Sequence, residues 1–188
     1  RYVFSELARN VLEHSESPVG AFVCAQYYRK SNRIAIGIAD AGIGILGSMR
    51  RHHPVDTAAL AVRLALQPGV TGTTARIGGT EFNAGAGLFF TKSIAALSRN
   101  FFVIYSGNAA FKLLRPPVAQ DPILHADPAS DRHRLVEVPY WPGTVVGIDV
   151  RVDQQVGFAA LLDEIRRAYS IDVKKRKKAY YKRIRFRP

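Results

Sequence analysis

Glu6 and Asn10 are the first two side chains whose types and spacing suit a chemical task. They stand four residues apart, so a helix would project both from the same face. A carboxylate placed there can orient or deprotonate a nucleophile, and an amide oxygen can bind Mg²⁺ without adding negative charge beside a phosphate. Taken alone, the pair fits the solvated face of an amphipathic helix better.

A second candidate is Asp40, which ends an apolar segment and is followed by Ala41-Gly42-Ile43-Gly44. A buried carboxylate can accept a hydrogen bond from an exocyclic amine such as N6 of adenine. The two glycines permit close approach and backbone angles that a side chain would forbid. An ordinary turn from strand to loop is the alternative, and an isolated motif of this kind favours the turn.

A glycine-rich segment, Asn83-Ala84-Gly85-Ala86-Gly87-Leu88, directly precedes an apolar helical pattern. Backbone N–H groups in such a loop can face phosphate oxygens, with support from the positive end of the helix dipole. A dinucleotide fold also begins this way, but it needs an acidic residue about 20 positions later. No acidic residue occurs between Glu81 and Asp121, which excludes the dinucleotide interpretation.

The fourth candidate is Thr144, which follows Gly143 at the start of an apolar strand pattern. Its hydroxyl can complete the polar contacts around a base, directly or through water. As a single observation, a plain turn explains it better.

Taken in order, these four motifs resemble those of the GHKL ATPases, the group that includes histidine kinases, DNA gyrase and MutL. The segment from Glu6 to Asn10 resembles the N box, Asp40 to Ile45 the G1 box, and Asn83 to Leu88 the G2 box. Gly143-Thr144 resembles the threonine motif of the adenine pocket. The resemblance spans about residues 3–152. The motif sequences are most similar to those of the histidine kinase and anti-sigma-factor branches.

The resemblance implies a role for each matching residue. Glu6 would be the general base, and Asn10 would hold Mg²⁺ and nucleotide. Asp40 would bind adenine, with Gly42 and Gly44 in the pocket wall and Thr144 supporting the base. Asn83, Gly85, Gly87 and Leu88 would lie at the phosphates, where Asn83 replaces the usual glycine and tolerates positive φ better than most residues. Residues 67–82 would form a lid from which Arg76 reaches phosphate; Lys92 fits a solvated lysine better than a phosphate ligand.

These residues need a scaffold, and hydrophobic periodicity predicts its elements. We expect helices over residues 3–14, 57–66, 88–99 and 158–169. We expect strands at 21–28, 33–40, 135–138 and 145–152, a hairpin formed by 101–105 and 110–114, a mobile loop at 67–87 and an irregular insert at 115–134. Strands and helices do not alternate strictly, which favours an α+β, two-layer α/β sandwich with a mixed sheet over a doubly wound fold. The resemblance implies the Bergerat form of this sandwich.

Charge is concentrated near the end of the chain. The protein has 188 residues and a net charge of +12, and nine of its cations lie between Lys174 and Arg187. Tyr180, Tyr181 and Phe186 are interleaved with them, a composition that suits nucleic acid, an anionic membrane surface or an acidic protein. A solvated segment, strand-like at 183–186, is the plainer alternative. We expect an ATP-binding domain over 1–152, followed by a helix and basic tail over 153–188.

Composition sets further limits. No apolar run reaches the length of about 18 residues that a membrane span needs. Cys24, the one cysteine, stands in an apolar segment, which predicts a buried thiol and a reducing, cytoplasmic setting. The histidines lack metal-ligand spacing. Because Arg1 stands at or just before a helix, we expect the chain to be a piece of a longer protein.

Three functions remain compatible with the sequence. The first is an ATP- and Mg²⁺-dependent kinase or ATPase in signalling, with an upstream domain or a partner protein as phosphoacceptor. The second is a nucleotide-gated interaction module without turnover. The third is a nucleic-acid-associated ATPase that uses the basic tail at 174–187. The sequence leaves open whether the chain dimerises.

Overall fold

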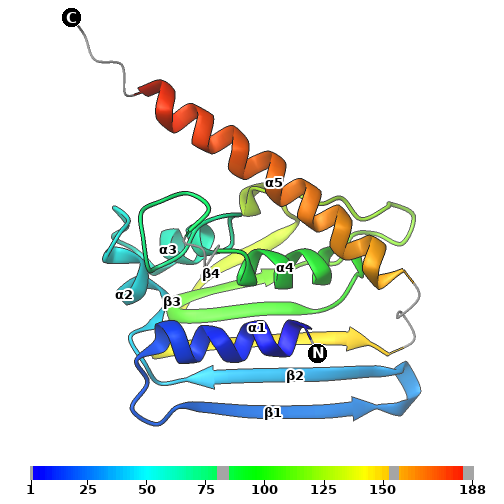
Figure 1. The fold of residues 1–188 in the computed structure, drawn as a ribbon. Coiled ribbons are helices and arrows are strands. Elements are labelled where there is room, and N and C mark those ends of the chain that lie inside the picture. The colour runs from blue at the N-terminus through cyan, green and yellow to red at the C-terminus, as the bar shows by residue number, and fades with distance from the viewer. Residues whose placement is uncertain (1, 80–84, 153–156, 184–188) are drawn as a thin grey trace, which may run out of the picture.

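The computed structural model describes residues 2–79, 85–152 and 157–183, which form an α+β fold (Figure 1). Its helices are α1 (Tyr2–Asn10), α2 (Gly44–Arg50), α3 (Ala58–Ala65), α4 (Gly87–Leu97) and α5 (Phe158–Arg183), with a π-helix at Val11–Ser15 and short 3₁₀ turns at Arg29–Ser31 and Pro128–Ser130. Its strands are β1 (Ala21–Tyr28), β2 (Arg33–Asp40), β3 (Phe102–Leu113) and β4 (His133–Arg151).

The four strands form one sheet in the order β1-β2-β4-β3, and every described pairing is antiparallel. The prediction of a mixed sheet is therefore wrong for this part of the chain. The segment from α2 to α4 does carry the chain across the sheet from β2 to β3, so these two strands run parallel. They are not neighbours, because β4 returns between them and pairs with both.

The predicted hairpin at 101–105 and 110–114 is also wrong. Both segments belong to the single strand β3, and its pairing with β4 shifts register at Ser106/Gly107 and again at Gly107/Ala109. Gly107 adopts a φ of +63°, so the predicted turn is a bulge instead. Likewise the predicted strands 135–138 and 145–152 are parts of the continuous strand β4.

The helices follow the predicted apolar stripes more closely. Val3, Leu7 and Val11 are buried, as their spacing predicts, but the α-helical geometry ends at Asn10 and a π-helical turn follows. Ser15 ends that turn by donating its hydroxyl to the carbonyl of Val11 at 2.7 Å. Helix α5 continues past the predicted end at 169 to Arg183, so the basic segment begins as a helix.

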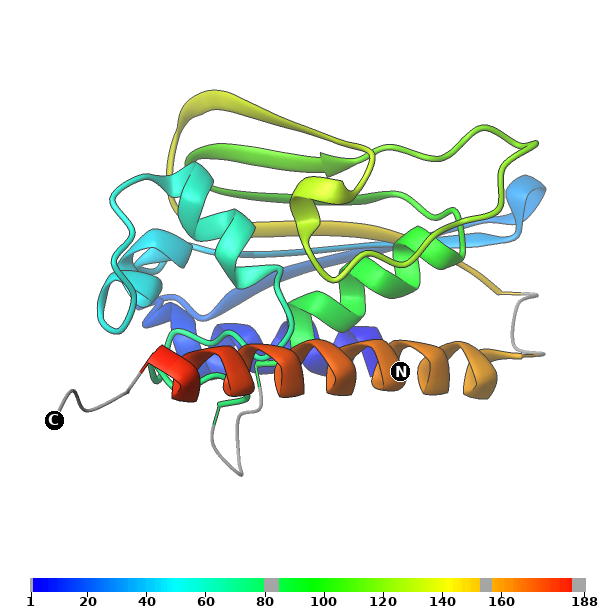
Figure 2. The ribbon, with the colours of Figure 1, turned by 90° about the horizontal axis from the view of Figure 1, so that it is seen from above.

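Helices α1, α4 and α5 lie on one side of the sheet (Figure 2), which gives two layers. The core between them is apolar and buried. Phe89 and Ile94 of α4 pack towards the sheet with Ile104 of β3 and Ile148 of β4, and Ile165 of α5 belongs to the same hydrophobic cluster. The sheet therefore supports the helices that carry the N-box and G2-like residues.

The predicted insert is irregular from residue 115 to residue 132, apart from its 3₁₀ turn, and its last two residues begin β4. It is fixed to α4 through Lys92. The Lys92 ammonium lies 2.5 Å from a carboxylate oxygen of Asp131 and donates to the carbonyl of His125 at 2.9 Å. Burial lowers the pKa of Lys92, and the charge of Asp131 opposes that shift. The interpretations of Lys92 as a solvated lysine or a phosphate ligand are both wrong, since its side chain is fully buried.

The structure corrects one further expectation. Cys24 is exposed, because β1 is an edge strand, so the prediction of a buried thiol is wrong. Among the described residues, none of the helices combines the length and the apolar character that crossing a membrane would require.

Candidate functional site

One cavity collects most of the predicted site residues. It opens between α1 with its π-helical extension, α2, the N-terminus of α4 and the sheet, and its empty volume is about 820 Å³ counted to its open mouth. Asn10, Asp40, Gly44, Gly85, Gly87, Leu88 and Thr144 all line it. Apolar walls come from Leu7, Val11, Ile38, Ile45, Met49, Ala65, Val70 and Val146. A mostly apolar cavity with a few convergent polar groups is typical of a small-molecule site.

At one end of this cavity lies Asp40, with only 4% of its surface exposed. One carboxylate oxygen, Oδ1, accepts hydrogen bonds from the N–H groups of Gly42 at 2.9 Å and Thr144 at 3.3 Å. Burial raises the pKa of Asp40, and these two hydrogen bonds oppose the shift. No described Lys or Arg forms an ion pair with it. The carboxylate therefore retains the capacity to accept an N–H from a ligand.

The predicted wall glycines have different tasks. Gly44 lines the cavity with a φ of +66°, and a Cβ there would lie 2.9 Å from the carbonyl oxygen of Pro142. Gly42 does not line the cavity. A Cβ at Gly42 would lie 1.8 Å from the carbonyl oxygen of Ser15, which also accepts the N–H of Ile43 at 2.8 Å. Gly42 thus lets the loop after β2 pack against the π-helix.

Two further residues, Ser106 and Trp141, shape this end of the cavity and were missed in the sequence. The buried Ser106 hydroxyl accepts the N–H of Ile45 at 2.8 Å and donates to the carbonyl of Gly143 at 2.9 Å. The Trp141 indole donates to the backbone carbonyl of Asp40 at 3.0 Å. No local sequence pattern marks either residue. Ile45 lies 61 positions from Ser106, and Asp40 lies 101 positions from Trp141.

At the other end of the cavity, Asn10 and Glu6 lie beside the start of α4. A Cβ on Gly87 would lie 2.8 Å from Oε2 of Glu6 and 3.6 Å from Oδ1 of Asn10, so a larger residue would crowd both side chains. Oε1 of Glu6 accepts from Arg9 at 2.9 Å. Glu6 lies just outside the cavity lining, whereas Asn10 belongs to it.

The Asn10 amide carries a buried polar atom without a partner. Its Nδ2 has no hydrogen bond to any residue that the structure describes. Leaving such a group unpaired costs about 1–3 kcal/mol, so buried polar groups normally have partners. Because Asn10 lines the cavity, this nitrogen keeps the capacity to donate to a ligand.

The remaining G2-like residues form the floor at this end. Gly85 adopts a φ of +65°, and a Cβ there would lie 2.6 Å from the carbonyl oxygen of Val70. Its own carbonyl accepts the N–H of Gly69 at 3.0 Å, which joins the two ends of the glycine-rich loop. Gly87 and Leu88 begin α4 at the cavity wall. Asn83 lies outside the described residues.

The predicted lid, residues 67–82, is described as far as residue 79. Val70, Thr71 and Gly72 line the cavity. Arg76 is exposed; its backbone N–H donates to Thr74 Oγ1 at 3.1 Å, and its carbonyl accepts the N–H of Gly79 at 3.0 Å. The structure thus brings the base of the loop to the cavity but does not bring the Arg76 side chain into its lining.

The polar groups of the site fit Mg²⁺ only if a nucleotide supplies further ligands. The described part of the chain holds no group of three or more His, Cys, Asp or Glu residues that could bind a metal ion. Magnesium bound together with a nucleotide needs less than that, because phosphates and water supply most of its ligands. The amide oxygen of Asn10, with Glu6 nearby, fits this smaller requirement.

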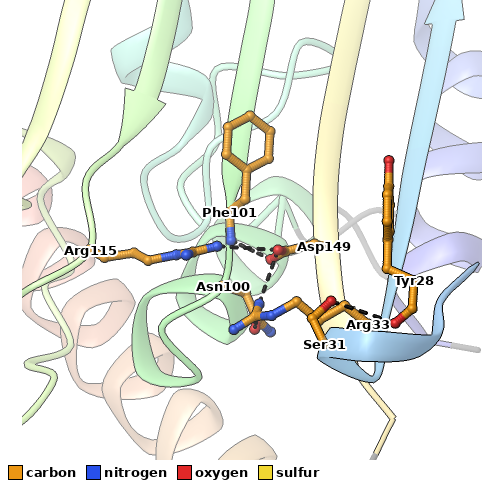
Figure 3. Close-up of polar contacts among 7 residues, drawn as sticks. All are labelled: Tyr28, Ser31, Arg33, Asn100, Phe101, Arg115 and Asp149. Atoms are coloured by element: carbon orange, nitrogen blue, oxygen red, sulfur yellow. Dashed lines mark hydrogen bonds and ion pairs between the residues drawn. The ribbon is translucent and has the colours of Figure 1, made fainter. Parts of the chain in front are cut away.

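A second polar cluster lies around Asp149 on β4, at the opposite end of the sheet (Figure 3). Asp149 Oδ2 accepts from Arg33 at 3.0 Å and from Arg115 at 3.2 Å, and its Oδ1 accepts the N–H of Phe101. Arg33 also donates to Asn100 at 3.1 Å. These groups satisfy one another, so the cluster joins β2, β4, the segment before β3 and the insert, and we interpret it as structural.

Comparison of the sequence with known protein families found no match, and comparison with curated proteins found none either.

Proposed function

We propose that the cavity binds ATP with Mg²⁺, and that the protein is a GHKL-type kinase or ATPase domain with the Bergerat form of the α+β sandwich. One observation carries the proposal. A buried carboxylate, Asp40, lines the same cavity as the start of a helix and Asn10, whose Nδ2 has no hydrogen-bond partner among the described residues. Each of these groups complements a different part of a purine nucleotide.

In this proposal the adenine base lies beside the carboxylate of Asp40. The carboxylate accepts a hydrogen bond from the exocyclic amine of adenine, and the Thr144 hydroxyl provides a further polar contact at the same end. The apolar walls, including Ile38 and Val146, enclose the ring. Guanine carries a carbonyl where adenine has its amine, so it would present an acceptor to a carboxylate. This geometry favours adenine over guanine, and it needs Asp40 in its charged form.

The phosphates would lie at the start of α4, where the N–H groups of its first turn and the helix dipole favour negative charge. The first turn of α4 contains no acidic residue that would oppose this. Asn10 would hold the magnesium ion, which supplies charge neutralisation on the phosphates when bound. Glu6 would orient or deprotonate the attacking group, since its Oε2 points to Gly87 at the same place.

Contacts between α5 and the loop at 67–79 favour a second candidate, a nucleotide-gated interaction module. Val173 of α5 packs into the loop, where a Cβ on Gly69 would lie 2.7 Å from its Cγ2. Arg176 donates to Gln67 at 2.7 Å. A nucleotide that reorders this loop would thereby alter the surface of α5, which a partner protein or a nucleic acid could detect. A cytoplasmic setting belongs to either candidate.

Calorimetry with ATP, ADP and GTP, each with and without Mg²⁺, tests the proposal. We expect ATP to bind more tightly than GTP. Asp40→Asn should weaken ATP binding by about 10–100-fold. The new amide N–H₂ would be a second donor facing the adenine amine, at the place where the carboxylate accepts its hydrogen bond. Asp149→Asn is the matched control, a carboxylate change on the same sheet that should leave ATP affinity unchanged. Unaltered ATP binding by Asp40→Asn would contradict the proposal.

Turnover separates the two candidates. Under the kinase or ATPase proposal, Glu6→Gln keeps ATP affinity and abolishes phosphate release or transfer. If the wild type binds Mg-ATP and releases no phosphate with any candidate acceptor, the interaction module is the better description.

A further inference from the structure

Strand β1 is an edge strand whose residues are all exposed. It pairs with β2 on one side, and no described segment pairs with it on the other (Figure 1). The other edge of the sheet differs, since alternate residues along β3 are buried. The exposed side chains of β1 include large apolar ones: Phe22 at 61%, Val23 at 52%, Tyr27 at 52% and Tyr28 at 48%. An apolar edge of this length is a template for pairing with another strand.

The usual devices that protect an edge strand are missing from β1. Its sequence, Ala-Phe-Val-Cys-Ala-Gln-Tyr-Tyr, contains no charged residue and no proline. Its register with β2 is unbroken from Ala21 opposite Asp40 to Tyr28 opposite Arg33, so no bulge bends it away. Lysines, prolines and bulges are what normally prevent such edges from pairing.

Net charge restricts which partner this edge suits. Nine of the cations behind the net charge of +12 lie between Lys174 and Arg187, so two copies repel each other most strongly where these basic segments approach. The uncharged β1 is a place where a second copy can approach without opposing like charges. Arg29 and Lys30, the nearest cations in sequence, follow the end of the strand.

The two faces of β1 determine the register of such a pair. Val23, Ala25 and Tyr27 pair with Ile38, Ile36 and Ile34, so they share the face that carries the helices. Phe22, Cys24, Gln26 and Tyr28 share the opposite face. If both copies keep their helices on the same side of a joined sheet, a residue can oppose only residues of its own face. The twofold axis must then pass midway between one residue and the same residue of the second copy.

We propose that two copies of the chain pair β1 with β1 in antiparallel register, with Ala25 opposite Ala25, to form one continuous sheet of eight strands. This register places Phe22 opposite Tyr28 on one face and Val23 opposite Tyr27 on the other. Aromatic–aromatic and aromatic–β-branched pairs are favourable cross-strand pairs, each contributing about 0.2–1 kcal/mol. A register centred on Cys24 would instead place Phe22 opposite Gln26 and Val23 opposite Ala25.

The mass of the full chain in solution, measured by light scattering over a range of concentrations without nucleotide, tests this pairing. The wild type should approach twice 20.8 kDa. Ala25→Lys should give a monomer, because two lysines would meet at the axis, and its circular dichroism should match that of the wild type since the site is exposed. Tyr140→Lys is the control: Tyr140 is 73% exposed on β4 and should tolerate lysine without loss of the dimer.

Cross-linking tests the register independently. Opposed Cα atoms in an antiparallel pair lie about 4.5–5.5 Å apart, within reach of a disulfide. Ala25→Cys in a Cys24→Ser background should therefore form a covalent dimer on mild oxidation. Cys24 of the wild type would lie on a diagonal of about 7–8 Å and should cross-link poorly. A monomeric wild type, a dimer that persists in Ala25→Lys, or efficient cross-linking through Cys24 instead of residue 25 would each overturn the proposal.

Discussion

Two carboxylates on neighbouring strands have opposite surroundings. Asp149 on β4 accepts hydrogen bonds from Arg33, Arg115 and a backbone N–H, and its neighbourhood is satisfied by the chain itself (Figure 3). Asp40 on β2 has two backbone N–H donors and, among the described residues, no cation. The first carboxylate joins segments of the fold. The second lines a cavity and keeps the capacity to accept a further hydrogen bond, which is what the proposed nucleotide site requires.

The largest effect we expect comes from Asp149→Ala. It would leave Arg33, with 20% of its side chain exposed, without its carboxylate partner. Removing one partner of a buried ion pair costs about 3–5 kcal/mol, and the partial exposure here reduces the expected loss to about 2–3 kcal/mol. Asp40→Ala leaves no cation behind and should cost less. Urea unfolding of both variants measures the two losses. Equal losses would remove the distinction between the two carboxylates.

The fold was predictable where its signals were local. The strands at 21–28 and 33–40 have the predicted bounds, because Ile34, Ile36 and Ile38 alternate and Asn32 supplies the turn between them with a φ of 48°. The sheet order and the continuity of β3 were not predictable. Ser106-Gly107-Asn108 has turn chemistry in any local window, and only pairing with β4 makes it a bulge.

The candidate site divides in the same way. Asn10, Asp40 and Gly87 were predicted to share one site from residue type and short spacing, and all three line the cavity. Ser106 and Trp141 were missed because their contacts join segments distant in sequence. The burial of Lys92 was missed for the same reason, since its partner Asp131 lies 39 positions away in an insert without periodicity.

The pH dependence of stability gives a second and smaller test of Asp40. Burial raises the pKa of Asp40, so the native state binds more protons than the unfolded state between the two pKa values. The contribution of Asp40 to stability must therefore fall as pH rises through that window and become flat above it. Asp40→Asn cannot titrate and lacks this contribution. Unfolding of both proteins from about pH 4 to pH 7 should show the wild type losing stability relative to the variant. A constant difference would mean that Asp40 is not desolvated.

The smallest expected change in stability belongs to Asn10, and its sign is opposite to that of Asp149. Asn10→Ala removes a buried amide nitrogen without a partner and adds a better helix former at the end of α1, so we expect stability to rise by about 0.5 kcal/mol. Under the proposed function, the same variant should bind Mg-ATP about 10-fold more weakly while its Mg²⁺-free ATP affinity stays constant.

Asn10→Asp serves as the matched variant, since it keeps a side-chain oxygen for the ion and should retain the effect of Mg²⁺. Denaturant unfolding and calorimetry with and without Mg²⁺ give the two readouts separately. A residue that merely supports α1 would lose stability on truncation and would leave the magnesium dependence unchanged. A gain of stability together with a loss of magnesium dependence is what the proposal requires, because the truncation removes both the unpaired amide nitrogen and the amide oxygen that would hold the ion.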